Sequence, residues 1–106
     1  MGMIKHYVFR KRADVSDTAL LEAAAATMAW FTERPGFAYR TLTREPDGLW
    51  HDMAFWRDAE AAAASDAAFF SHAPNAAYVA LVDPESLSRS LLPELLSALP
   101  RDLEAA

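Results

Sequence analysis

The chain has 106 residues, enough for one domain with one core, and we take residues 1–106 as that domain. Its composition, 53% hydrophobic and 24% charged, is that of a globular protein, and the lack of cysteine excludes disulfides, thiol catalysis and cysteine-ligated metals. A net charge of -5 argues against a nucleic-acid partner, because no basic excess exists to displace counterions from phosphates. Without a segment typical of a signal peptide or a transmembrane span, we expect a cytoplasmic protein with no membrane partner.

The first third of the chain predicts a strand followed by a long helix. Residues 4–10 are dense in β-branched and aromatic side chains, as in a strand. Asp14 or Ser16 can cap a helix that runs to the residues just before Pro35. Trp30 lies outside the apolar stripe of this helix, so we expect it to contact a partner, the C-terminal tail or a ligand. The stripe consists of Leu20, Leu21, Ala24, Met28 and Phe31.

The middle of the chain predicts a β-hairpin and a second helix. Residues 37–44 and 49–57 have strand composition, and the Glu-Pro-Asp-Gly sequence between them is typical of a tight turn. Asp58 can then cap an alanine-rich helix that extends to about Ser71.

The last third predicts a short helix, a strand and a tail. Pro74 suits the first turn of a helix that continues to Val82. Serine or arginine alternates with leucine over residues 86–92, which predicts a half-buried last strand. The tail from Pro93 is expected to form at most a helical turn.

The resulting order, β-α-β-β-α-β, predicts an α+β, ferredoxin-like fold: a four-stranded antiparallel sheet with the helices on one face. In the strand at 49–57, both alternating sets of side chains are rich in large apolar groups. Helices cover only one face of such a sheet, so the other face needs a second cover. We therefore expect a homodimer that pairs through this sheet face and forms a dimeric barrel.

Three segments carry a resemblance to a known family: RPGF before the second strand, DGLWHDMAFWRDAEAA at residues 47–62, and FFSH with AYVALVDPESL at residues 69–72 and 77–87. With the element order, they resemble the dimeric α+β barrel superfamily, and within it the small antibiotic-biosynthesis monooxygenase-like and stress-responsive barrel proteins. The resemblance implies paired sheets and a pocket in each subunit. Haem-degrading members combine Asn, Trp and His, whereas Asn75 here follows the second helix, which argues against that activity.

Three polar residues are candidates for catalysis. If the first and third strands are neighbours, His6 can approach Asp52, and Arg40 on the second strand can complete a cluster. A carboxylate beside a histidine fixes its tautomer and raises its basicity, as a general base requires. The alternative is a polar network that keeps the register of a dimer core without doing chemistry.

Aromatic residues are candidates for a substrate pocket, and plain core packing is the alternative for them. The set comprises Trp50, Trp56, Phe69 and Tyr78, with His72, which could also simply sit at a helix C-terminus, added as a substrate contact. His51 has the opposite parity to Asp52 and is expected under the helices or at a strand edge. The spacing of the three histidines matches no metal-binding signature, so we expect no metal and no cofactor.

The interpretation we favour is a cofactor-independent monooxygenase-like enzyme, as the resemblance implies, that acts on a small apolar or aromatic molecule. His6 would be the base, Asp52 its orienting partner, and Arg40 the group that stabilises the substrate anion. Two alternatives stay open: a non-catalytic small-ligand-binding or stress-response dimer, and a lactone isomerase or cyclase using the same base.

Overall fold

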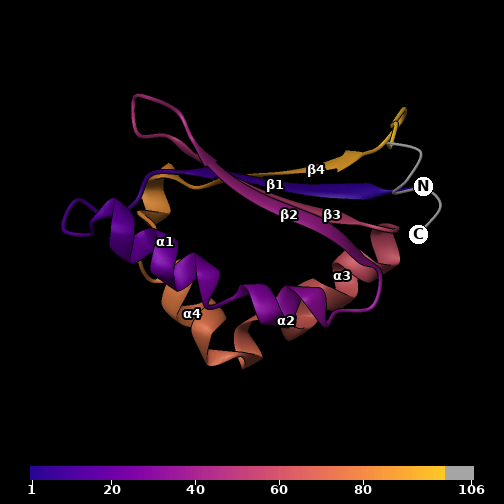
Figure 1. The fold of residues 1–106 in the computed structure, drawn as a ribbon, viewed down its shortest axis with the longest axis horizontal. Helices are drawn as coiled ribbons and strands as arrows, with labels where there is room; N and C mark the ends of the chain where they lie inside the picture. Colours follow the sequence, from indigo (N-terminus) through magenta and orange to yellow (C-terminus); the bar gives the residue numbers. More distant parts are fainter. Residues whose placement is uncertain (100–106) are drawn as a thin grey trace.

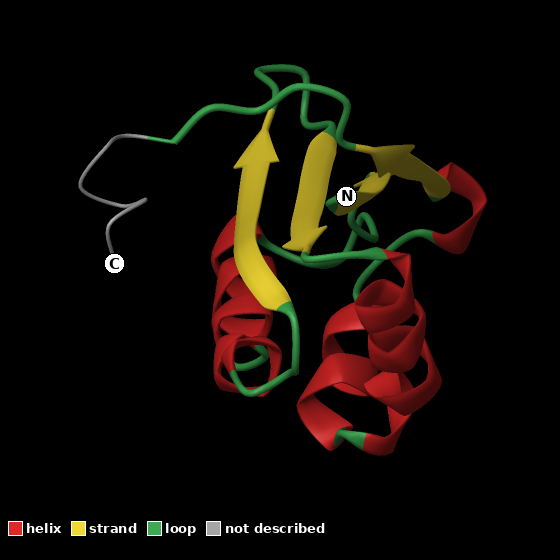
Figure 2. Ribbon diagram, turned by 90° about the vertical axis from the view of Figure 1, so that its right-hand side faces the viewer, coloured by secondary structure: helices red, strands yellow, loops and turns green. Residues whose placement is uncertain are grey.

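A four-stranded antiparallel sheet carries the helices on one of its faces (Figure 1). The structure is a computed structural model and describes residues 1–99. The strands are β1 (Met3–Phe9), β2 (Phe37–Arg44), β3 (Trp50–Trp56) and β4 (Ser88–Pro93). They lie in the order β2-β3-β1-β4, which is the predicted ferredoxin-like arrangement. The turned view shows helices on one side of the sheet and none on the other (Figure 2).

Burial along β3 alternates residue by residue and defines the two faces of the sheet. Trp50, Asp52, Ala54 and Trp56 are buried beneath the helices, whereas the residues between them are half-buried on the face without helices, here called the open face. A bulge in β2 between Phe37 and Tyr39 changes which face later residues of that strand occupy.

The long helix predicted before Pro35 is two helices, α1 (Asp17–Ala25) and α2 (Met28–Thr32). Ser16 caps α1 by accepting a hydrogen bond from the backbone of Ala19. Thr27 interrupts the run: its hydroxyl donates to the carbonyl of Ala24 at 2.6 Å, a local bond that competes with regular helix geometry.

This interruption changes which side chains of the run are buried. Trp30, predicted outside the stripe, packs edge-on against Phe31 and Phe69, and its ring stacks on His72. The expectation of a partner, tail or external ligand for Trp30 was therefore wrong. Leu21, predicted within the stripe, is exposed.

The second helical region follows its prediction closely. Asp58 caps α3 (Ala59–Ala68), which continues into a single 3₁₀ turn and then into α4 (Ala73–Val79), with Pro74 in its first turn. The close approach of α3 to the start of β2 requires Gly36, whose φ is +78° and whose hypothetical Cβ would lie 2.6 Å from the Cβ of Ala61.

The C-terminal part differs from its prediction in burial. All six residues of β4 are exposed, so the last strand is not half-buried within one chain. Residues 94–99 contain no helical turn, and the rest of the predicted tail, 100–106, lies outside the described residues. Within residues 1–99, no helix is both long enough and apolar enough to cross a membrane.

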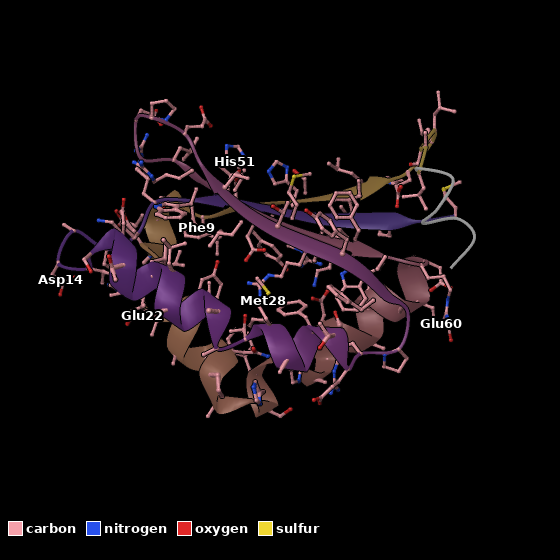
Figure 3. The ribbon with its side chains drawn as sticks, viewed as in Figure 1. Phe9, Asp14, Glu22, Met28, His51 and Glu60 are labelled. Carbon is pink, nitrogen blue, oxygen red and sulfur yellow. The ribbon has the colours of Figure 1, made fainter. Side chains whose placement is uncertain are left out.

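Two apolar clusters form the core between the sheet and the helices. One surrounds Phe9, Leu20 and Trp50, and the other surrounds Phe31 and Trp56. In the side-chain view, Phe9 and Met28 lie on the helix side of the sheet and His51 lies above the open face (Figure 3). The candidate site occupies the space between the sheet and the helices.

Candidate functional site

A cavity of about 390 Å³ lies between the helix-facing side of the sheet and the helices. Its volume is near the lower end of the range that holds small organic ligands. Most of its wall is aromatic or aliphatic, contributed by β1, β3 and the helical segments, including Phe9, Phe31, Trp56, Phe69 and Phe70. Polar side chains reach it from all four strands, so the cavity combines largely apolar walls with charged groups.

Arg40, Asp52 and Tyr78 form a buried hydrogen-bonded network in the cavity wall. Arg40 Nε donates to Asp52 Oδ1 at 3.0 Å, and its Nη2 donates to Oδ2 at 2.8 Å, a two-bond geometry that matches a carboxylate. The Tyr78 hydroxyl donates to the same Oδ2 at 2.8 Å. The Arg40 and Asp52 side chains are only 1% and 11% exposed, which strengthens their interaction.

Two further contacts fix the position of the Arg40 guanidinium. Its Nη1 donates to the hydroxyl of Thr27, at the break between α1 and α2. Its Cζ lies 4.1 Å from the ring centre of Phe31, within cation–π distance. The helix break therefore places a hydroxyl where the sheet's buried cation needs an acceptor.

The protonation of Tyr78 follows from this environment. Burial raises the pKa of the Tyr78 phenol, and the negative charge of Asp52 raises it further. Tyr78 therefore stays a neutral hydrogen-bond donor at physiological pH. Asp52 Oδ1 accepts only the one bond from Arg40 among the described residues, so that oxygen retains a free lone pair.

A second polar group, missed by the sequence analysis, lies where β1 and β4 meet α3. Lys5 and Arg89 both form ion pairs with Asp66, and all three residues line the cavity. Tyr7 stands opposite Asp52 in β3 and opposite Arg89 in β4, so it connects the two polar groups. The sequence did carry a signal, because Lys5 shares its parity with Tyr7 and Phe9, which are cavity residues.

Burial has a large effect on Lys5, whose side chain is 7% exposed. It lowers the pKa of the Lys5 ammonium to about 8; the positive charge of Arg89 also lowers it, and the negative charge of Asp52 raises it. Burial also raises the pKa of the Tyr7 phenol, so Tyr7 is a neutral donor.

The predicted approach of His6 to Asp52 is wrong. In the register of β1 and β3, His6 lies opposite Met53 and Asp52 lies opposite Tyr7. Because successive side chains of a strand point to opposite faces, His6 is on the open face and Asp52 is beneath the helices. The prediction that Arg40 lies close to Asp52 is confirmed by their two hydrogen bonds.

His6 has different partners on the open face. Its Nε2 lies 2.9 Å from His51 Nδ1, and His51 Nε2 lies 2.5 Å from Glu45 Oε2. The two histidine rings are stacked, with centres 5.2 Å apart. The sequence analysis predicted His51 under the helices or at a strand edge. That prediction was wrong, because His51 lies on the open face of β3, a strand with a neighbour on each side.

Of the predicted pocket residues, three line the cavity and two do not. Trp56, Phe69 and Tyr78 are in its wall. Trp50 is the first residue of β3, at the end of the strand away from Trp56, and it packs in the cluster around Phe9 and Leu20. His72 is directed to the Trp30 ring, since the chain turns there between the 3₁₀ turn and α4.

Within the part of the chain that the structure describes, no three His, Asp or Glu side chains are placed to hold a metal ion. The expectations of no metal and no cofactor stay predictions.

A scan against protein-family models gives no match, and a search of curated proteins gives none. Solved structures do resemble this one. SnoaB, a cofactor-independent oxygenase from Streptomyces nogalater, is 24% identical with a TM-score of 0.74, over 94% of this chain and 98% of that one. The ActVA-Orf6 monooxygenase of Streptomyces coelicolor, in complex with the ligand nanaomycin D, is 21% identical with a TM-score of 0.72, over 93% and 92%.

A candidate antibiotic biosynthesis monooxygenase from Nitrosomonas europaea is 13% identical with a TM-score of 0.70, over 89% of this chain and 90% of that one. The chain therefore has the ferredoxin-like α+β fold of antibiotic biosynthesis monooxygenase-like proteins. This confirms the fold and the structural resemblance predicted from the sequence.

Proposed function

We propose that this protein is a cofactor-independent monooxygenase-like enzyme that acts on a small aromatic molecule held in the cavity. The observation that carries the proposal is the buried Arg40–Asp52–Tyr78 network in the wall of an aromatic cavity. Apolar walls favour a flat aromatic substrate, and a dry site strengthens every charge interaction within it. The names of the structural neighbours support the same reaction class.

The chemistry begins with an acidic phenol or carbon acid. Asp52 Oδ1, with its free lone pair, accepts the substrate proton in place of His6. Arg40 stabilises the anion that forms, the role the sequence analysis gave it, and Tyr78 holds Asp52 in place through its hydrogen bond to Oδ2. The substrate anion then reacts with dioxygen, one atom entering the product and the other leaving as water.

We further propose that two copies pair through the open face. It carries apolar side chains from all four strands, among them Tyr39 and Leu92, which are 59% and 41% exposed. Large apolar patches of this kind are rarely left in contact with water. The His6–His51–Glu45 chain would then be a polar seam that sets the register between the two sheets.

The test is oxygen consumption with anthrone, a tricyclic carbon acid whose reaction with one O₂ gives anthraquinone and one water. The protein should accelerate oxygen uptake above the spontaneous rate in buffer. Asp52→Asn should remove the acceleration, whereas His6→Gln, on the other face, should keep it under conditions where the oligomer persists. A chain that binds anthrone without accelerating uptake would instead be a non-catalytic ligand-binding dimer.

A further inference from the structure

The cavity has an end that the proposed reaction does not use. Lys5 and Arg89 line the wall between β1 and β4, and Tyr7, which stands opposite Asp52, lies between them and the Arg40–Asp52 pair. We propose that this end binds a carboxylate of the aromatic ligand, so that the substrate is an aromatic monocarboxylic acid. The inference rests on the proposed function, because it assumes an aromatic ligand in the same cavity.

The charge balance of the cavity wall supports an anion. Asp52 is neutralised by Arg40, with which it shares two hydrogen bonds. Asp66 is the acceptor for two cations, Lys5 and Arg89. Three cations thus face two carboxylates, and one positive charge is left over at the β1–β4 end.

Unused donors at this end support a hydrogen-bonding ligand. A lysine ammonium has three donors, and the described residues give Lys5 only one acceptor, Asp66, although its side chain is buried. The Tyr7 hydroxyl has no hydrogen-bond partner among residues 1–99 and stays protonated. Arg89 uses one of its guanidinium nitrogens on Asp66 and is half-exposed. Lys5 is buried, Tyr7 is half-buried and Arg89 is half-exposed, so a ligand in the cavity can accept hydrogen bonds from the donors that these side chains leave unused.

The same features select a carboxylate rather than a phosphate. One excess positive charge matches a monoanion, whereas a phosphate monoester would bring close to two negative charges near Asp66. A planar carboxylate also continues the plane of an aromatic ring, and the walls contributed by Phe9, Phe31 and Trp56 suit a flat molecule. An arginine and a lysine side by side are common carboxylate ligands.

The pH dependence follows from the groups that face Lys5. These are Asp66 on α3, Arg89 on β4, Asp52 on β3 and Tyr7 on β1. Burial and the positive charge of Arg89 lower the Lys5 pKa, the negative charge of Asp52 raises it, and in the free protein the pKa is about 8. A carboxylate prefers the protonated amine, so its affinity should be constant from about pH 6 to pH 8 and then fall, by up to about tenfold per pH unit.

The experiment compares two probes of one shape, 2-naphthoate and the neutral 2-naphthamide, by isothermal titration calorimetry. We expect the acid to bind at least about tenfold tighter than the amide at pH 7, since its hydrogen bonds are charge-assisted. Lys5→Met and Arg89→Gln should each lower the affinity for 2-naphthoate by about tenfold, and should change the affinity for 2-naphthamide by less than a factor of three. Lys11→Met, which removes a lysine that does not line the cavity, should change neither.

The outcomes separate this inference from the proposed function. Equal affinity for the acid and the amide, or a loss of both probes in Lys5→Met, overturns the carboxylate site and leaves the aromatic cavity in place. A failure of both probes to bind the unaltered protein at millimolar concentration overturns the proposed function together with it. A fall in acid affinity above pH 8 that disappears in Lys5→Met supports the carboxylate site independently of the size of the affinities.

Discussion

Replacing Arg40 with methionine removes the positive partner of a buried carboxylate and should destabilise the protein strongly. Asp52 would keep the hydrogen bond from Tyr78 but lose two bonds from Arg40, and Thr27 would lose its donor. Removing one member of a buried ion pair costs about 3–5 kcal/mol, because the remaining charge is left desolvated. For a domain of this size, that lowers the melting temperature by roughly 12 °C or more.

The assay is urea unfolding followed by far-ultraviolet circular dichroism, at a fixed protomer concentration because pairing would add to stability. The matched control is Arg10→Met, which breaks an exposed pair with Asp47. Exposed pairs contribute about 0–1 kcal/mol, so the control should unfold almost as the unaltered protein does. If Arg40→Met cost no more than Arg10→Met, the network would not be the buried, desolvated structure described above, and the argument for its role would fail.

Three other predictions concern Lys5, the open face and Gly36. In the folded protein the pKa of Lys5 is lowered to about 8, so between pH 8 and 10 the unfolded chain binds more protons and the free energy of unfolding should rise with pH. Lys5→Met should remove this rise in urea titrations. An unchanged pH dependence in that variant would contradict the prediction. Phe55→Glu puts a charge on the open face and should therefore give a folded monomer, measured by analytical ultracentrifugation. If this variant were still a dimer, the two copies would have to pair through another surface. Gly36→Ala should lower the free energy of unfolding by more than the cost of left-handed backbone strain, about 1–2 kcal/mol, because the new Cβ would meet Ala61. Gly48→Ala, the control, should show the cost of the strain alone. Equal losses for the two variants in chemical unfolding would mean that α3 moves freely to make room for the Cβ.

The fold was largely predictable because its signals are local. Asp58 and Pro74 mark helix starts, and the Glu-Pro-Asp-Gly turn fixes the hairpin, so the element order followed from short stretches of chain. The break at Thr27 was not predictable from helical periodicity. The Thr27 hydroxyl donates to the nearby Ala24 carbonyl and accepts from Arg40, and the second contact joins it to a strand that the local sequence does not contain.

The site was only partly predictable because it depends on register. Asp52 and Arg40 were correctly brought together, since a tight turn fixes how β2 and β3 pair. The pairing of β1 with β3 has no short turn, and parity alone cannot decide whether His6 or Tyr7 stands opposite Asp52. The actual register of β1 against β3 differs by one residue from the predicted one. His6 therefore lies on the opposite face of the sheet, and Lys5, which lines the cavity, was not predicted as a site residue.

The placement of the tryptophans has an optical consequence. Of the three, Trp56 lines the cavity, and its buried indole nitrogen has no hydrogen-bond partner within residues 1–99. Trp50 lies in the other apolar cluster, and the Trp30 ring contacts both the Arg34 guanidinium and the His72 ring. Trp56 should therefore emit at short wavelength and lose intensity when an aromatic molecule enters the cavity, while the other two form a steady background. The difference between the emission of the unaltered protein and of Trp56→Phe isolates that signal, so occupancy of the cavity can be followed without attaching a dye.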